Sequence, residues 1–194
     1  MTKWIMWAFV AGTLACTSAL AADSNARVAC SALDEKDAVQ LLGGPLGEVF
    51  KNEVLPSPEN GRDHNTVCGF FPNGYKIQSA DGPPERGVQL QLHAMTNEAA
   101  AQAFYENAFQ SRKDMANMPG SPLAGSKIST LTGIGKAAFL VERDPSSARG
   151  ASYKLATLGF LKGNVMAQIQ VWKNDGSAGE IARNAGRKVA AKLP

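Results

Sequence analysis

The sequence predicts an α+β fold, in which an antiparallel sheet of about five strands packs against three helices in the order α-β-β-α-β-β-β-α. One observation is the alternation of apolar and polar residues over 88–94, which is typical of a strand with one buried face. The other is the helical spacing of apolar residues in three separate segments, near the start, in the middle and at the end of the chain. Because helices and strands do not alternate regularly, a doubly wound α/β fold is not expected.

The first expected helix is short and has a clear beginning and end. Asp34 can cap it, Asp37 stands three residues later, and Leu33 and Ala38 can form a hydrophobic staple. Residues 43–45, which are Gly-Gly-Pro, end it, because glycine tolerates the left-handed conformation and proline cannot continue the turn.

Two loops and two strands are expected next. Proline, glycine and polar residues predict an exposed loop over 51–66, and a strand over 67–71 carries Cys68. A second loop is expected over 72–87. In the strand over 88–94, the side chains expected to face the core are Val88, Leu90, Leu92 and Ala94.

A second helix is expected to begin after Thr96 or Asn97, either of which can cap it. Its apolar stripe, which predicts that it lies across the sheet, consists of Ala101, Phe104, Tyr105, Ala108 and Met115. Residues 112–126 contain two prolines and two glycines and are expected to form the longest linker.

The second half of the chain predicts strands at about 137–142, 152–161 and 165–172, with a tight turn over 162–164. The third helix begins at a capping box over 177–180, and Ile181, Ala185 and Val189 form its apolar stripe.

The two halves of the chain are also candidates for an internal duplication. Aligning Val88 with Val165 matches Gln91 with Gln168, and each strand then leads into a helix. Part of this match is what any amphipathic strand followed by a capped helix would give.

The first residues predict export. An apolar run from Trp4 to Ala15 follows Lys3 and precedes Ala19-Leu20-Ala21, which together are typical of a secretory signal peptide over 1–21. We therefore expect residues 22–194 to be a single globular domain, periplasmic or secreted. The apolar run is shorter than the roughly 20 residues that a membrane-spanning helix needs, so no transmembrane segment is expected.

An alternative interpretation of the same leader is a lipid anchor. Thr13-Leu14-Ala15-Cys16 resembles a bacterial lipobox, although Thr13 stands where that motif usually has leucine or a similar aliphatic residue. In this alternative Cys16 carries a lipid and tethers the protein to the envelope.

Two of the three cysteines, Cys30 and Cys68, lie beyond the leader, and the oxidising destination predicts that they form one disulfide. Closing a loop of this length stabilises a fold by roughly 4 kcal/mol at most in the chain-entropy model. The chain has no Cys-x-x-Cys motif, and no activating group is identified by spacing, so a catalytic thiol is not expected.

Charge and motifs exclude several function classes. Without Lys3 and the rest of the leader, 19 basic residues stand against 17 acidic ones, which is far from the cationic excess of a nucleic-acid binder. Gly133-x-Gly135-x-x-Ala138 is similar to a dinucleotide fingerprint, but a strand is expected after it, where that chemistry needs a helix, so a turn is the better interpretation. We therefore predict no catalytic residues, no cofactor and no metal.

Weaker candidates for site residues are the two histidines beyond the leader, the methionines and the carboxylates. His64 is expected in a polar loop, and His93 is expected at one of the polar positions of an alternating strand. Met115 and Met118, with Met95 and His93, could offer a soft Cu(I) site, although methionine more often fills a core. The carboxylates expected at a helix start or in loops are Asp34, Glu35, Asp37, Glu59, Asp63, Asp81 and Glu85.

Three segments carry a likeness to a known family over about residues 29–193. They are Cys30-Ser31-Ala32-Leu33 leading into Leu41-Leu42-Gly43, Cys68-Gly69-Phe70, and the stretch from Gly133 to Phe139. In these the chain resembles small exported bacterial α+β domains, often lipoproteins, of the PsbP/Mog1-like type. The resemblance implies a curved antiparallel sheet on helices and accessory, binding or assembly roles, and it transfers no active site.

The leading functional hypothesis is an exported, non-enzymatic domain that binds a partner protein or a small ligand through the loops 51–66, 72–87 and 112–126. One alternative is an inhibitor or immunity protein that blocks an exported enzyme. Another is a hydrolase whose carboxylates converge only in three dimensions.

Overall fold

The computed structural model describes residues 29–47, 49–54, 62–72, 85–143 and 154–194. The expected signal peptide and Cys16 lie outside the described residues. Most of the expected loop over 72–87 lies outside them as well, and so does the segment from 55 to 61.

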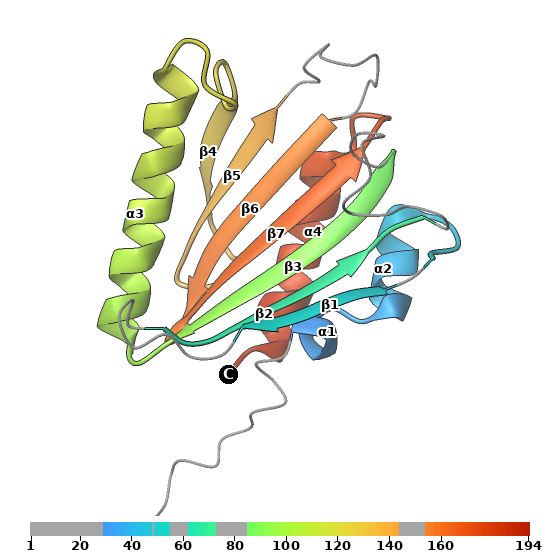
Figure 1. Ribbon diagram of the computed structural model, residues 1–194, viewed down its shortest axis with the longest axis horizontal. Helices are drawn as coiled ribbons and strands as arrows, with labels where there is room; N and C mark the ends of the chain where they lie inside the picture. Colours follow the sequence, from blue (N-terminus) through green and yellow to red (C-terminus); the bar gives the residue numbers. More distant parts are fainter. Residues whose placement is uncertain (1–28, 48, 55–61, 73–84, 144–153) are drawn as a thin grey trace, which may run out of the picture.

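The described residues form one antiparallel sheet of seven strands in the order β1-β2-β3-β7-β6-β5-β4 (Figure 1). In chain order the strands are β1 (Val49–Val54), β2 (Arg62–Phe70), β3 (Arg86–Met95), β4 (Lys127–Leu131), β5 (Ala137–Arg143), β6 (Lys154–Lys162) and β7 (Val165–Lys173). The helices are α1 (Ala29–Ala32), α2 (Glu35–Leu42), α3 (Glu98–Asn117) and α4 (Ala178–Lys192). None of these helices is both long and apolar enough to cross a membrane.

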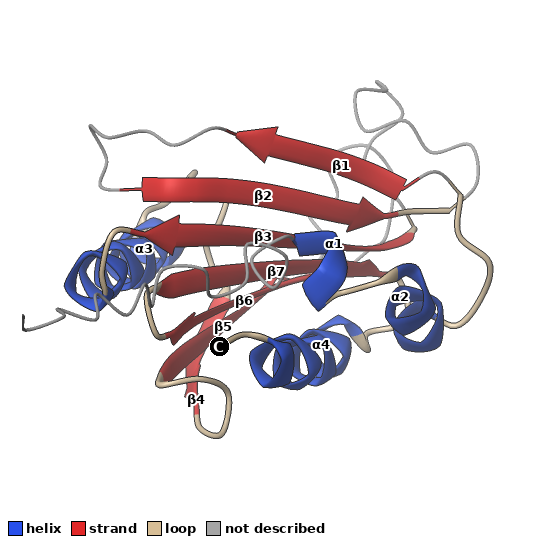
Figure 2. Ribbon diagram, turned by 90° about the horizontal axis from the view of Figure 1, so that it is seen from below, coloured by secondary structure: helices blue, strands red, loops and turns tan. Residues whose placement is uncertain are grey.

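The helices lie on opposite faces of the sheet and create two cores (Figures 1 and 2). On one face α1, α2 and α4 cover the larger core, which includes Leu90, Leu158 and Ile169 from the central strands. On the other face α3 covers a smaller core that includes Met95, Tyr105 and Phe139. Alternation along the central strands therefore directs one set of side chains to each core.

The α+β class and the antiparallel sheet are confirmed, but the sheet is larger than the expected five strands. The two additional strands, β1 and β4, form the two edges of the sheet. Edge strands face fewer apolar neighbours and carry a weaker alternation, and β4 has only five residues between two turn-rich segments. The expected loop over 51–66 is wrong in part, because β1 continues to Val54 and β2 already begins at Arg62.

Two helix predictions also need correction. The expected linker over 112–126 begins with helix, because α3 continues to Asn117. At α4, Ser177 occupies the N-cap position without a side-chain capping bond, and its hydroxyl instead donates to Asp175 Oδ1 at 2.5 Å. By contrast, Asp34 caps α2 as expected, accepting from the Asp37 amide at 2.8 Å.

The suggested likeness of the two halves ends at their strands. β3 and β7 lie side by side, and Gln91 faces Gln168 directly across this pair. However, α3 and α4 pack on opposite faces of the sheet. Equivalent strands followed by helices on opposite faces are not repeats of one unit.

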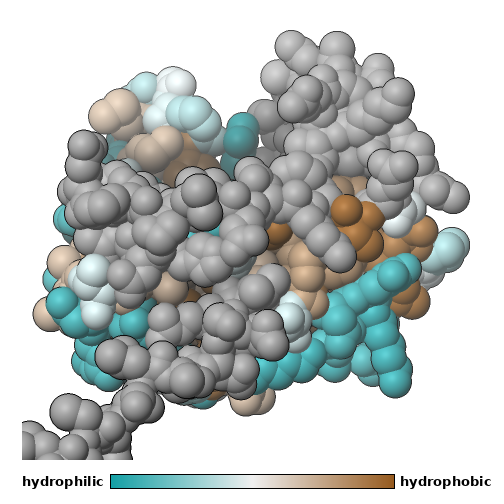
Figure 3. Space-filling view, turned by 60° about the horizontal axis from the view of Figure 1, so that its bottom comes forward, coloured by the Kyte–Doolittle hydropathy of each residue, from teal (hydrophilic) through white to brown (hydrophobic). Residues whose placement is uncertain are grey.

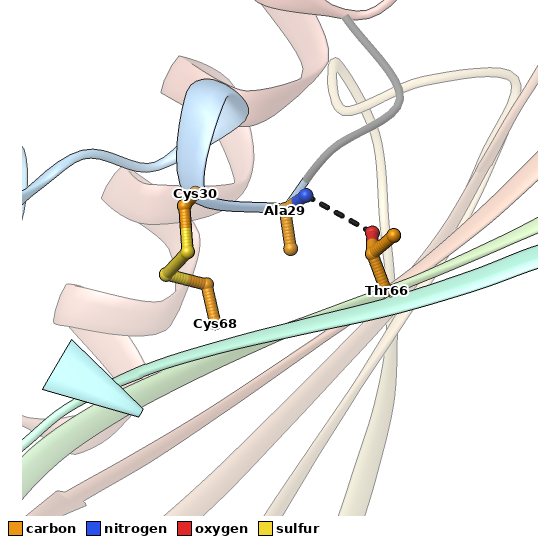
Figure 4. Close-up of a disulfide and its surroundings, with 4 residues drawn as sticks. All are labelled: Ala29, Cys30, Thr66 and Cys68. Atoms are coloured by element: carbon orange, nitrogen blue, oxygen red, sulfur yellow. Dashed lines mark hydrogen bonds between the residues drawn. A yellow bond between two sulfur atoms is a disulfide. The ribbon is translucent and has the colours of Figure 1, made fainter. Parts of the chain in front are cut away.

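A disulfide joins Cys30 in α1 to Cys68 in β2, as the sequence predicted (Figure 4). Beside it, the Ala29 amide donates to Thr66 Oγ1 at 3.0 Å. Cys68 is fully buried and Cys30 is partly buried. The covalent bond and the hydrogen bond together hold the single turn of α1 on the sheet.

An ion-pair cluster ties α2 to α4. Asp37 accepts from Lys188 at 2.8 Å and from Lys192 at 2.7 Å, and its side chain is only 13% exposed. Burial alone would raise the pKa of Asp37, but hydrogen bonds from the two lysines outweigh burial and lower the pKa below its ordinary value of 3.8. Lys188 and Lys192 are therefore bound to a helix far away in sequence.

Asp37→Asn is expected to lower the free energy of unfolding by about 1 kcal/mol at neutral pH, a modest value because both lysines are partly exposed. Because the pKa of Asp37 is lower in the folded state, the wild type is more stable than the variant at any pH above the ordinary aspartate pKa. This difference in the free energy of unfolding disappears as the pH falls through the folded-state pKa of Asp37. Urea denaturation at pH 7 and at pH 3 measures both effects. Asp34→Asn is the control, because asparagine caps a helix equally well and only a 3.6 Å contact to Lys192 is lost; an equal loss in the two variants would contradict the assignment.

Candidate functional site

A strip of polar side chains crosses the face of the sheet on which α3 packs. Gln89 and Gln91 alternate along β3 with residues of the larger core and so point to the opposite face. In β7, Gln168 and Gln170 lie directly across from Gln91 and Gln89. We call the following residues the polar strip: Asn65, Gln89, Gln91, Thr157, Gln168 and Gln170.

Members of the polar strip contact one another and are not fully solvated. Gln91 Nε2 donates to Asn65 Oδ1 at 3.3 Å. Asn65 is only 9% exposed and Thr157 only 8%. A row of amides on a sheet offers both donors and acceptors to a bound molecule.

Arg112 reaches the polar strip from the last turns of α3. Its guanidinium donates to the carbonyl oxygen of Ala108 at 3.0 Å and to Gln168 Oε1 at 2.6 Å. It also lies over the ring of Phe139, 5.5 Å from the ring centroid. Among the ion pairs that the described residues form, none involves Arg112. Burial lowers the pKa of Arg112, so its positive charge is partly desolvated, and no described carboxylate pairs with it.

A groove of about 250 Å³ opens between the C-terminal half of α3, the turns that follow it and strands β5, β6 and β7. Its polar lining consists of Ser111, Arg112, Thr157 and Gln170. Its apolar lining consists of Met115, Pro122, Leu123, Val141 and Leu155. The groove thus joins one cation and part of the polar strip to an apolar wall.

Ser121 fixes the turn that closes one side of the groove. Its hydroxyl donates to the carbonyl oxygen of Met115 at 2.5 Å and accepts from the Leu123 amide at 3.0 Å. Gly120 and Gly125 adopt positive φ on either side, which permits the chain to fold back after α3. Pro122 and Leu123 are held over the groove as a result.

The sequence candidates are distributed differently from the expectations. His93, at a polar position of β3, is only 6% exposed, and its ring lies 4.9 Å from that of Phe104 of α3. For His64, the structure describes only the backbone, in β2. Met95 is buried under the first turns of α3, whereas Met115 lines the groove at the other end of that helix. These residues are therefore not brought together as the Cu(I) hypothesis requires.

Among the carboxylates named in the sequence, those that the structure describes do not line the groove. Asp34 and Asp37 belong to the contacts of α2, and Glu35 and Glu85 are exposed. The side chains of Glu59, Asp63 and Asp81 lie outside the described residues. Within the described ranges no group of three histidine, cysteine or acidic residues could hold a metal ion.

The segment with Gly133 and Gly135 is a turn, as expected, because strand β5 and not a helix follows it. Gly135 has a φ of 60° and lies against the carbonyl oxygen of Leu161, where an added Cβ would collide. The segment is therefore a connection between β4 and β5.

Of the three segments expected to carry binding, 112–126 contributes to the groove. The sequence did not identify Arg112, Gln168 or Gln170 as site residues. A signal was present for the arginine: it falls on the same helical stripe as Tyr105, Ala108 and Met115, so a cation interrupts an apolar face. The glutamines occupy the polar positions of two alternating strands. A sheet face that is exposed to solvent has the same pattern, so the pattern does not identify a site.

On the side shown in Figure 3, hydrophobic and hydrophilic residues border one another at the surface. Among the described residues, only two large hydrophobic side chains are strongly exposed, Val39 at 37% and Met118 at 57%. Strongly exposed large hydrophobic side chains are therefore few among the described residues.

Comparisons with known proteins find a structure with a similar fold, but they do not assign the chain to a family. No family model matches the chain, and no curated protein matches it. Among solved structures, the extracellular domain of PknH from Mycobacterium tuberculosis has a TM-score of 0.51 with 13% sequence identity. The match covers 81% of this chain and 95% of that domain.

This likeness shows a shared fold with an extracellular bacterial α+β domain. It supports the general part of the resemblance stated from the sequence. The narrower PsbP/Mog1-like assignment is not supported, because the matching structure is of a different kind.

Proposed function

We propose that the chain is an exported, non-enzymatic binding domain that holds a small ligand in the groove between α3 and the sheet. The groove supports this proposal, because it combines directional polar groups with an apolar wall, as small-molecule sites commonly do. Arg112 is the observation that carries it. A partly desolvated cation with no carboxylate partner among the described residues is costly to the fold alone, and a ligand can offset that cost.

Export is supported by three independent features. Residues 1–21 have the pattern of a signal peptide, the chain has a disulfide between Cys30 and Cys68, and an extracellular domain shares its fold. We place the protein in the periplasm or outside the cell. A tether through Cys16 is the alternative form of the same location.

The binding proposal is tested with small probes and a variant that fills the groove. Ser111→Trp places an indole at the groove, whereas Ala103→Trp places the same group on an exposed position nearer the start of α3. Ligand-observed NMR with benzoate, hexanoate, benzamide and glycerol is expected to show binding of at least one probe to the wild type and to Ala103→Trp, and none to Ser111→Trp. If no probe binds, or if Ser111→Trp binds as the wild type does, the groove is not the site.

A further inference from the structure

Resting on the proposed function, we infer that the groove selects a small monocarboxylate with an apolar body, whose carboxylate binds Arg112. Four features of the groove support this inference: the free donors of the guanidinium, the single charge of the described lining, the apolar wall and the position of Gln168.

Arg112 has donors left for a ligand. A guanidinium carries five N–H groups in a planar fork, which matches the two oxygens of a carboxylate. Two of its N–H groups are used, for the carbonyl oxygen of Ala108 and for Gln168 Oε1. Because Arg112 lines the groove, the remaining donors are available to an anion that enters it.

The described lining of the groove has a formal charge of +1. Arg112 is the single charged residue among the described residues that line it. One carboxylate neutralises this charge, whereas a phosphate dianion would leave an excess negative charge in a partly desolvated site. Ser111, Thr157 and Gln170 can donate further hydrogen bonds without changing the charge balance.

The rest of the lining favours an apolar body. Five apolar residues, from α3, the turn that Ser121 fixes and strands β5 and β6, surround the remaining space. A sugar or another polyol would leave hydroxyl groups without partners against this wall. The volume of about 250 Å³ lies below the roughly 300–1,000 Å³ of sites for drug-sized molecules, so the ligand is small, such as an aromatic or short-chain acid.

Gln168 positions Arg112 without neutralising it. Its amide oxygen accepts from the guanidinium at 2.6 Å, and at the same place a glutamate would have formed an ion pair. A neutral acceptor orients the cation and keeps its charge for the ligand. Gln168 is therefore a positioning residue for the proposed carboxylate site.

Calorimetric titration at neutral pH with matched acids and amides tests the inference. Benzoate and benzamide have nearly the same shape and differ in charge, as do hexanoate and hexanamide. We expect each acid to bind the wild type at least tenfold more tightly than its amide. In Arg112→Gln this preference should disappear, while Lys113→Gln, which removes an exposed cation from the next position of α3, should retain it.

The outcomes separate this inference from the proposed function. If benzamide binds as tightly as benzoate and Ser111→Trp blocks both, the groove binds ligands but the carboxylate assignment is wrong. If neither acid nor amide binds, both are wrong. If circular dichroism shows that Arg112→Gln does not fold, Arg112→Lys takes its place, because it keeps the positive charge and loses the planar fork. An acid preference that is unchanged in Arg112→Lys would show that the fork of Arg112 does not bind the two carboxylate oxygens.

Discussion

Replacing both Cys30 and Cys68 with alanine is expected to lower the free energy of unfolding by about 4 kcal/mol. The two residues are 38 positions apart, and breaking the bond releases the closed loop in the unfolded chain. In the folded state, α1 would be held mainly by its buried alanines and by the hydrogen bond from Ala29 to Thr66. Alanine is preferred to serine because Cys68 is fully buried, and a hydroxyl there would need a partner.

Guanidinium chloride denaturation of the double variant and of the oxidised wild type measures this difference. The wild type treated with a reductant is the control, and it should lose a similar amount. Protein recovered from the periplasm should resist alkylation at both cysteines until it is reduced. A loss below 1 kcal/mol, or free thiols in the exported protein, would show that the disulfide does not support the fold.

Phe139→Ala is expected to lower the free energy of unfolding by about 3–5 kcal/mol, the range for emptying a large aromatic site in a core. Phe139 is fully buried at the centre of the smaller core. Its ring centroid lies 5.5 Å from that of Tyr105 and 5.3 Å from that of Phe109, and both of these residues come from α3. Removing the ring therefore loosens α3 on the sheet and removes the surface on which Arg112 rests.

Phe139→Leu is the matched control, because it keeps most of the volume and should lose much less stability than the alanine variant. Chemical denaturation gives both values. The packing also explains Gly159, which lies across from Phe139 in the neighbouring strand and leaves room for its ring. Two variants with equal stability losses, or an alanine variant within 1 kcal/mol of the wild type, would contradict this view of the smaller core.

The parts of the fold that the sequence predicted correctly depend on short-range patterns. The alternation over 88–94 predicted the buried face of β3, and the capping residue Asp34 predicted the start of α2. The turn over 162–164 gave the hairpin of β6 and β7. In each of these elements, a few neighbouring residues determine the local conformation, so the single sequence is sufficient.

The edge strands and the groove could not be predicted because they depend on contacts between distant residues. β1 exists as a strand because it pairs with β2, and its own residues do not alternate clearly. Arg112 and Gln168 are 56 positions apart and meet only after α3 packs across the sheet. The apolar stripe of a helix likewise does not determine the face of the sheet on which the helix packs. Both α3 and α4 are amphipathic, but they pack on opposite faces.

The most direct test of a carboxylate site in the groove is an NMR titration of the isotope-labelled protein with benzoate. We expect the side-chain signals of Arg112, Gln168 and Gln170 to shift together and saturate, while the backbone amides of α2 on the opposite face stay unchanged. Benzamide at the same concentrations should cause much smaller shifts of these three signals. Arg112 and Gln170 signals that stay unchanged throughout the titration would show that benzoate does not bind in the groove.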